Sequence, residues 1–275
     1  MRRLTLETVE GVWHADGNRP HDLSIPLRFN GEQPNLFAAP AASATPLRSG
    51  DFIGDVSLGG SCNCAQYQLT PHCNGTHTEC IGHVTRQRVS VRDIHAGGLL
   101  RALLVSVTPV PAESSREDTD PAPQPDDQII TAEALKAAWL PFSATRASAL
   151  VIRTLPNDAA KIGRHYEAGR PPAYLTRQAA ELIVARGVEH LVLDVPSFDR
   201  SHDQGKLTGH RIFWGLPAGG TDVTAAQRPQ ATITEMAYVP SALDDGRYIL
   251  DLQVAPFATD AAPSRPLLYS AADAR

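Results

Sequence analysis

The order of apolar and polar positions predicts a chain that is rich in strands near both ends and helical in its middle. Apolar or alternating runs of strand length occur at 21–29, 51–58, 64–69, 85–91, 99–107, 149–154, 190–195, 231–238 and 248–254. A helical period behind Thr131 and Thr176 as N-caps predicts helices at 132–139 and 176–186. Gly187 stands where a glycine commonly ends a helix, and the buried strand 190–195 follows it. This succession is typical of an α/β unit, so we expect a mixed β/α fold with a sheet-rich core and flanking helices.

Residues 108–128 interrupt the pattern. They are rich in proline and end in the acidic run Pro125-Asp126-Asp127, which predicts a surface loop rather than a linker between domains. A chain of 275 residues with 42% hydrophobic residues can bury one full core. We therefore expect residues 1–275 to form a single domain that carries this loop on its surface.

Composition and charge restrict the location and the partners. The net charge is −5 and no basic stripe is visible, which argues against nucleic acid as a partner. No apolar stretch is long enough to cross a bilayer, and Arg2 and Arg3 are not followed by the apolar run of a signal peptide. We expect a soluble, cytoplasmic protein without a membrane partner.

The four cysteines, Cys62, Cys64, Cys73 and Cys80, all fall in one short segment. In a cytosolic chain such clustering favours metal or redox chemistry over a disulfide scaffold. A closed structural zinc site on these cysteines is one alternative, although their spacing lacks paired C-x-x-C knuckles. Small buried apolar side chains are an equally good interpretation of Cys62 and Cys64.

Residues 71–83, which read PHCNGTHTECIGH, carry the clearest chemical signal. Histidine, cysteine and glutamate are ligands of Zn, Mn or Fe. His77 and Glu79 point to the same face if they lie on a strand, because side chains alternate along it. Gly75 would allow a sharp turn that brings Cys73 or His72 to the same ion.

His83 lies farther along, beyond Gly82. Histidine is the side chain that most readily exchanges protons near neutral pH, so His83 suits a proton carrier better than a ligand. Other catalytic patterns are absent from the sequence: there is no G-x-S-x-G elbow, P-loop, H-E-x-x-H or dinucleotide fingerprint.

The same segment resembles the signature H-x-G-T-H-x-D-x-P-x-H of the cyclase family, a group of metal-dependent hydrolases that includes bacterial kynurenine formamidase. Gly75-Thr76-His77 matches G-T-H, Glu79 stands at the aspartate position, and His83 stands at the final histidine. Further likeness to the family lies in Asp22-Leu23-Ser24, in 179–188, in Asp194-Val195-Pro196-Ser197 and in the closing segment 260–265.

The resemblance implies a divalent metal, Zn or Mn, held by His77 and Glu79 with Glu235 as the late carboxylate. It implies His210 as the histidine of a second metal, with His202 as the weaker candidate. The first histidine of the signature is replaced by Cys73, with His72 beside it, so either residue could be the first ligand. His83 would act as general acid or base.

The activity implied by the resemblance is hydrolysis of an amide, formamide or lactam bond in a small-molecule substrate. Family members are commonly dimers or tetramers, so a homo-oligomer is expected. Three signature positions differ, at Cys73, Glu79 and Ile81, which leaves the substrate and the number of metals open. A metal-binding protein that has lost catalysis and a module held by a cysteine zinc site are the alternatives.

Overall fold

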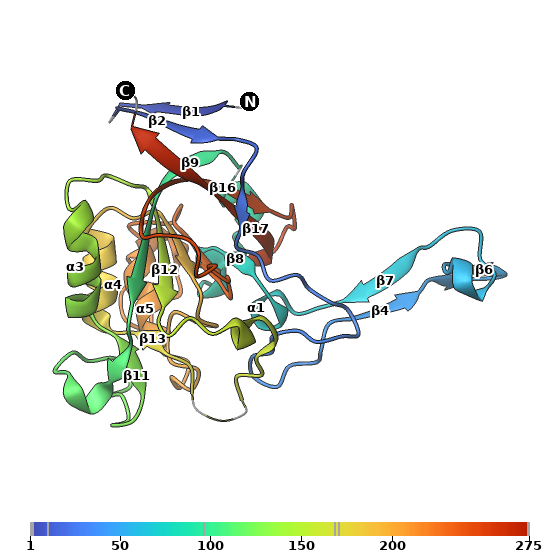
Figure 1. Cartoon of the computed structure of the whole chain (residues 1–275). Helices are drawn as coiled ribbons and strands as arrows, with labels where there is room; N and C mark the ends of the chain where they lie inside the picture. Colours follow the sequence, from blue (N-terminus) through green and yellow to red (C-terminus); the bar gives the residue numbers. More distant parts are fainter. Residues whose placement is uncertain (1–2, 10, 96, 168, 170, 274–275) are drawn as a thin grey trace.

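Seven strands pair in a closed circuit at the centre of the computed structural model, which describes residues 3–273 except 10, 96, 168 and 170 (Figure 1). In order around the circuit these strands are β17 (Ala261–Asp273), β16 (Gly246–Val254), β9 (Leu99–Val107), β12 (Ala149–Thr154), β14 (His190–Leu193), β15 (Thr232–Glu235) and β8 (His77–Glu79). The start of β17 pairs back onto β8 and closes the barrel. The mixed β/α fold class predicted from the sequence is confirmed.

The strands β9, β12, β14 and β15 run parallel to one another, whereas β8 is antiparallel to both of its neighbours. Every residue of β12 and β14 is buried, which explains why both were readable as continuous apolar runs. Because the parallel strands end at one edge of the sheet, residues that follow them come close together there. Glu235 ends β15 and Asp194 directly follows β14 at this edge.

Helices α3 (Ala132–Trp139) and α4 (Arg177–Ala185) lie side by side on the outer face of the barrel (Figure 1). Both predicted N-caps are confirmed, since the Thr131 hydroxyl accepts from the Ala134 amide and the Thr176 hydroxyl accepts from the Ala179 amide. Their apolar sides pack on the sheet in one core cluster, which includes Leu135, Ile183, Leu150 and Leu191. A third helix, α5 (Thr208–Trp214), packs against α4.

Shorter strands and helices lie outside the closed circuit of seven strands. Strands β1 (Arg3–Thr8), β2 (Gly11–Asp16) and β3 (His21–Asp22) extend the sheet beside β17, and β10 (Val110–Pro111), β11 (Gln128–Ile130) and β13 (Tyr174–Leu175) form a small separate sheet. An arm projects from the body in Figure 1; it is built from β4 (Ser43–Pro46), β5 (Arg48–Ser49), β6 (Phe52–Ile53) and β7 (Ala65–Gln68). The short helices α1 (Pro71–Asn74) and α2 (Val91–Ile94) lie on either side of β8 in the sequence.

Three expected strands differ from the structure. Only His21–Asp22 of 21–29 is a strand, and 51–58 becomes the short strand β6 followed by a 3₁₀ turn at Val56–Leu58. The Asp55 carboxylate accepts from the Ser57 amide and so starts that turn. Within 85–91 no residue is in a strand, and α2 begins at Val91.

The loop 108–128 lies against the two outer helices. The Glu117 carboxylate accepts from the Ala132 amide and from the Thr176 hydroxyl, which fixes the loop to the beginnings of α3 and α4. Of the helices in the described part of the chain, none has the length and apolar character needed to cross a membrane.

Candidate metal centre

Strand β8 supplies two of the expected ligands from the middle of the sheet. His77 and Glu79 are fully buried, and the pairing with β15 places His77 directly opposite Glu235. The Nε2 atom of His77 lies 3.5 Å from Glu235 Oε2. The predicted strand alternation therefore brings two positions of the 71–83 segment to a carboxylate from the far end of the chain.

His77 is held in one orientation by the main chain. Its Nδ1 atom lies 3.0 Å from the Gly75 carbonyl oxygen, which can only accept, so Nδ1 donates to this oxygen and Nε2 is turned toward Glu235. Glu235 is in turn fixed by the Phe198 amide, which donates to its Oε1 at 2.7 Å.

Helix α5 adds His210. Its Nε2 atom lies 3.0 Å from Glu79 Oε1 and 3.5 Å from Glu235 Oε1. Its Nδ1 atom donates to Asp199 Oδ2 at 2.6 Å, and the same carboxylate accepts from the Gly209 and His210 amides. A carboxylate behind the outer nitrogen of a histidine is a common arrangement around metal ligands.

His72 reaches the site from α1, and Cys73 does not. The Nδ1 atom of His72 lies 3.1 Å from Glu79 Oε2, and its Nε2 atom lies 2.8 Å from Asp260 Oδ2. Cys73 instead packs in an apolar cluster with Leu36, Tyr166 and Met236. The expected sharp turn at Gly75 is wrong, because Gly75 is extended with φ 165° and α1 makes the change of direction.

One face of this cluster is open. His72, His83 and Asp260 have side chains that are 25%, 26% and 39% exposed, whereas those of His77, Glu79, His210 and Glu235 are at most 5% exposed. His83 lies 3.9 Å from Glu79 Oε2 and 3.5 Å from Asp260 Oδ2, in both cases farther away than His72. A cavity of about 340 Å³ adjoins the open face at Gly82 and Asp260.

The buried atoms of the cluster fit a divalent metal. His77 Nε2 and both carboxylate oxygens of Glu79 are buried without a hydrogen-bond partner, which is costly for polar atoms unless an ion or other group satisfies them. Ligand atoms of His72, His77 and Glu79 lie within 4.8 Å of one another, as do those of Glu79, His83 and His210 and those of His72, His83 and Asp260. Imidazole and carboxylate together are common ligands of divalent transition metals.

Charge neighbours shift the pKa values of the cluster strongly. Burial alone would lower the pKa of His72, but the hydrogen bond to Asp260 and the negative charge of the nearby Glu79 outweigh it and raise the value to about 10. Burial opposes the charge of His210 too, yet the Glu79 carboxylate and Asp199 hold its pKa well above the usual range. Burial would raise the pKa of Glu79, but His83 and His210 hold it well below the usual range. These shifts favour protonated His72 and His210 beside an ionised Glu79 when no metal is bound, and a bound metal ion would displace the protons.

The remaining sequence candidates lie elsewhere. His202 has a side chain that is 76% exposed and pairs with Glu167, so the structure does not bring it to the cluster. Cys62 and Cys64 are exposed on the arm, and Cys80 is buried in an apolar cluster with Val91 and Ala262. Among the described residues no cysteine belongs to a group that could hold a metal, so the cysteine zinc site is not formed.

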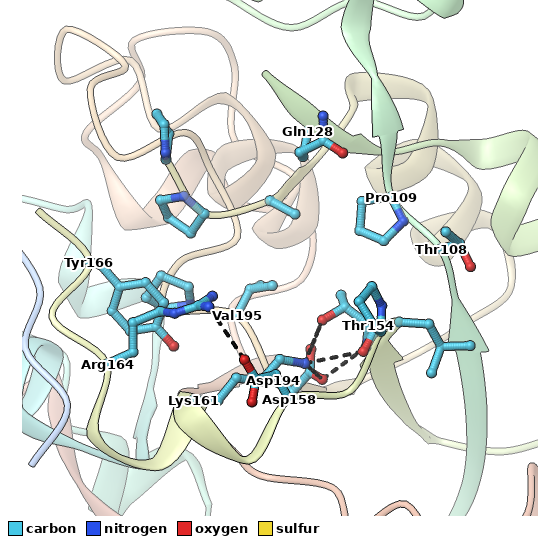
Figure 2. Close-up of a pocket in the computed structure, with 16 residues that line it drawn as sticks. Thr108, Pro109, Gln128, Thr154, Asp158, Lys161, Arg164, Tyr166, Asp194 and Val195 are labelled. Atoms are coloured by element: carbon cyan, nitrogen blue, oxygen red, sulfur yellow. Dashed lines mark hydrogen bonds and ion pairs between the residues drawn. The ribbon is translucent and has the colours of Figure 1, made fainter. Parts of the chain in front are cut away.

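A second cavity, of about 370 Å³, opens at the carboxyl ends of β9, β12 and β14 (Figure 2). It is lined by the buried pair Lys161 and Asp194, joined at 2.6 Å, and by Arg164. The cavity is lined by none of the metal-cluster residues, but Tyr166 lines it and also belongs to the apolar cluster that contains Cys73. It is a neighbouring polar pocket with different chemistry.

Sequence reasoning missed Asp199 and Asp260, which hold the outer nitrogens of His210 and His72. Neither residue lies in the histidine-rich segment. Asp260 was visible only as the first residue of the closing segment 260–265, and Asp199 only as a neighbour of Asp194-Val195-Pro196-Ser197. The fold brings Asp260 to His72 and Asp199 to His210, and a motif of neighbouring residues in the sequence cannot show such contacts.

Comparisons with known proteins place these observations in a family. The family model described as Putative cyclase matches residues 21–200, more than half of the chain. An isatin hydrolase bound to the product analogue thioisatinate shares the fold with a TM-score of 0.60 at 16% identity, over 92% of each chain. Isatin hydrolase A from Labrenzia aggregata bound to benzyl benzoate gives 0.59 at 13% identity, over 91% of this chain and 93% of its own.

A predicted metal-dependent hydrolase from Bacillus stearothermophilus gives a TM-score of 0.54 at 14% identity, over 91% of this chain and 98% of its own. A search of curated proteins finds no match. The matched family segment ends before His210, Glu235 and Asp260, so the structure is what joins these residues to the signature.

Proposed function

This chain belongs to the cyclase family, and from that premise we propose that it is a metal-dependent hydrolase of an amide, formamide or lactam bond in a small molecule. The observation that carries the proposal is the set of buried, unpaired atoms on His77 and Glu79, which face further imidazoles. Kynurenine formamidase belongs to the same family, and several structural neighbours are named as hydrolases.

The five proposed ligands come from four elements. His77 and Glu79 lie on β8, Glu235 ends β15, His210 lies on α5, and His72 replaces Cys73 as the first ligand. A divalent ion, Zn or Mn, supplies Lewis-acid activation of a carbonyl and of water when it is bound. The buried carboxylates Glu79 and Glu235 provide the negative charge that stabilises such a cation.

The substrate approaches over the open face, because the inner four side chains are buried behind it. Hydrolysis adds water across the carbon–nitrogen bond: the carbonyl carbon gains the hydroxyl group and the leaving nitrogen gains a proton. His83 stands on this face next to Glu79 and is less tightly bound than His72. It is therefore suited to carry the proton to the leaving nitrogen.

A homo-oligomer, dimer or tetramer, and a cytoplasmic location also belong to the proposal, as expected for this family. Light scattering of the purified protein tests the first, and fractionation of the source cells tests the second.

The test of the activity is a hydrolysis screen. Protein stripped with a chelator and reloaded with Zn or Mn should cleave N-formyl aryl amines or cyclic amides, and stripped protein should not. His202→Ala, which removes an exposed histidine outside the cluster, should behave like the wild type. Metal binding without turnover of any such compound would favour the alternative, a metal-binding protein that has lost catalysis.

A further inference from the structure

Three histidines of the cluster each have one ring nitrogen held by an oxygen atom outside the group of proposed ligands. His77 is held by the Gly75 carbonyl, and His210 is held by the Asp199 carboxylate at 2.6 Å. His72 is held by Asp260 at 2.8 Å. In each case an oxygen fixes one ring nitrogen, so that the other nitrogen faces a carboxylate of the cluster.

His72 needs this support more than the other two. It lies one residue before the signature position, which Cys73 occupies, and it comes from the four-residue helix α1 rather than from the sheet. Successive residues on a helix point about 100° apart, which is why Cys73 turns into the apolar cluster when His72 turns to the site. A quarter of the His72 side chain is exposed, so packing alone restrains it less than the buried His77 and His210.

Asp260 is itself held firmly beside the site. The Cys80 amide donates to the Asp260 carbonyl at 2.9 Å, and the next residue, Ala261, pairs with Glu79 in the sheet. The backbone of Asp260 is therefore fixed to the strand that carries the ligands, and its carboxylate reaches outward to His72. This anchorage makes it a suitable fixed support.

We propose that Asp260 is the positioning residue that makes the displaced His72 a metal ligand. Its carboxylate accepts a hydrogen bond from His72 Nε2 and so turns Nδ1 toward Glu79, where Nδ1 could bind an ion in place of its proton. Asp260 acts through His72 and does not itself bind the ion that Glu79 holds. The inference rests on the proposed function, because it assumes that the cluster holds a metal.

Metal affinity in a double-mutant cycle tests this role. Asp260→Ala should weaken Zn or Co binding about 10- to 100-fold, the usual effect of removing an outer partner of a ligand, and Asp260→Asn should restore part of the loss. In the His72→Ala background, Asp260→Ala should cause no further loss. Asp251→Asn, at a half-buried position of β16 outside the cluster, is the matched control and should leave affinity unchanged.

The absorption spectrum of the Co-loaded protein separates support from direct ligation. If Asp260 is only a support, saturating Co should give the wild-type band intensity in Asp260→Asn. A changed spectrum at saturation would make Asp260 a ligand, for example with His72 and His83, and would overturn the proposal. Additive losses in the cycle, or unchanged affinity in Asp260→Ala, would also overturn it. Wild-type protein that binds no metal would overturn the proposed function as well.

Discussion

Two groups of buried charges lie near one edge of the parallel strands, and they differ in how their polar atoms are satisfied. Lys161 donates to Asp194 at 2.6 Å and to the Thr154 hydroxyl at 2.8 Å, and the Thr154 amide donates back to Asp194. In the metal cluster, both Glu79 oxygens and His77 Nε2 lack a hydrogen-bond partner.

The comparison separates buried charged groups whose hydrogen bonds are complete from those that still have unpaired polar atoms. The Lys161–Asp194 pair is closed, since each charge is met by an opposite charge and by hydrogen bonds, and it stabilises the loop that follows β12. In the Glu79 cluster the carboxylates of Glu79 and Glu235 repel each other, and without a metal ion only histidines held in their protonated form offset this charge. We infer that the Lys161–Asp194 pair stabilises the fold and that the Glu79 cluster binds a metal ion.

The largest expected effect concerns His83. His83→Ala should retain the metal and the melting temperature but lose roughly 10²–10⁴-fold in turnover, because it removes the proton carrier and no ligand. Rate, metal content and melting temperature measured on this one variant separate the possibilities. A parallel loss of metal would make His83 a ligand, and full activity would exclude the proposed proton transfer.

Breaking the Lys161–Asp194 pair should lower the stability of the fold and leave metal affinity unchanged. Lys161→Met leaves the buried Asp194 carboxylate without its cation, which typically costs about 3–5 kcal/mol of unfolding free energy. Denaturant unfolding measures this change, with Lys136→Met on the exposed side of α3 as the control. If metal affinity fell in Lys161→Met as much as stability did, the two groups would not be independent.

Removing one charge from the metal cluster should weaken metal binding and leave the stability of the fold almost unchanged. Glu235→Gln keeps an oxygen to accept from the Phe198 amide, so the fold should persist, but the lost charge should weaken metal binding by at least about 10-fold. Competition with a chelator measures this, and Glu181→Gln on the exposed face of α4 is the control. Unchanged affinity would assign the charge to another residue.

A buried histidine outside both groups should make the stability of the fold depend on pH. Burial, with the nearby His95, lowers the pKa of His190 from the usual 6.5 to about 4. The folded state therefore binds fewer protons than the unfolded chain between these values, so stability is complete above pH 6.5 and falls as the pH drops toward 4, by up to about 3 kcal/mol. His190→Asn should flatten this fall in unfolding titrations, whereas the exposed His202→Asn should not.

The parts of the fold that depend on a local sequence pattern could be predicted from the sequence. Helices α3 and α4 were predicted because threonine caps and apolar periods coincide in them, and β12 and β14 because they are buried on both faces. Helix α5 was missed because it has no side-chain cap of its own. Leu207 precedes it in a left-handed conformation, and the distant Asp199 accepts from its first amides.

The candidate site was readable where the ligands are close in sequence. His77 and Glu79 share a strand face, and that alternation is a local property. The choice between His72 and Cys73 was not readable, because it depends on how α1 is rotated against Asp260 and the apolar cluster around Met236. Such orientations are set by tertiary packing.

The metal content of the His77→Ala variant tests the central claim most directly. Wild-type protein, purified or reloaded, should hold about one divalent transition metal per chain, and His77→Ala should lose most of it while keeping its fold. His202→Ala should retain the full amount. Full metal content in folded His77→Ala, measured by elemental analysis, would contradict the account and place the metal away from the buried His77–Glu79 cluster.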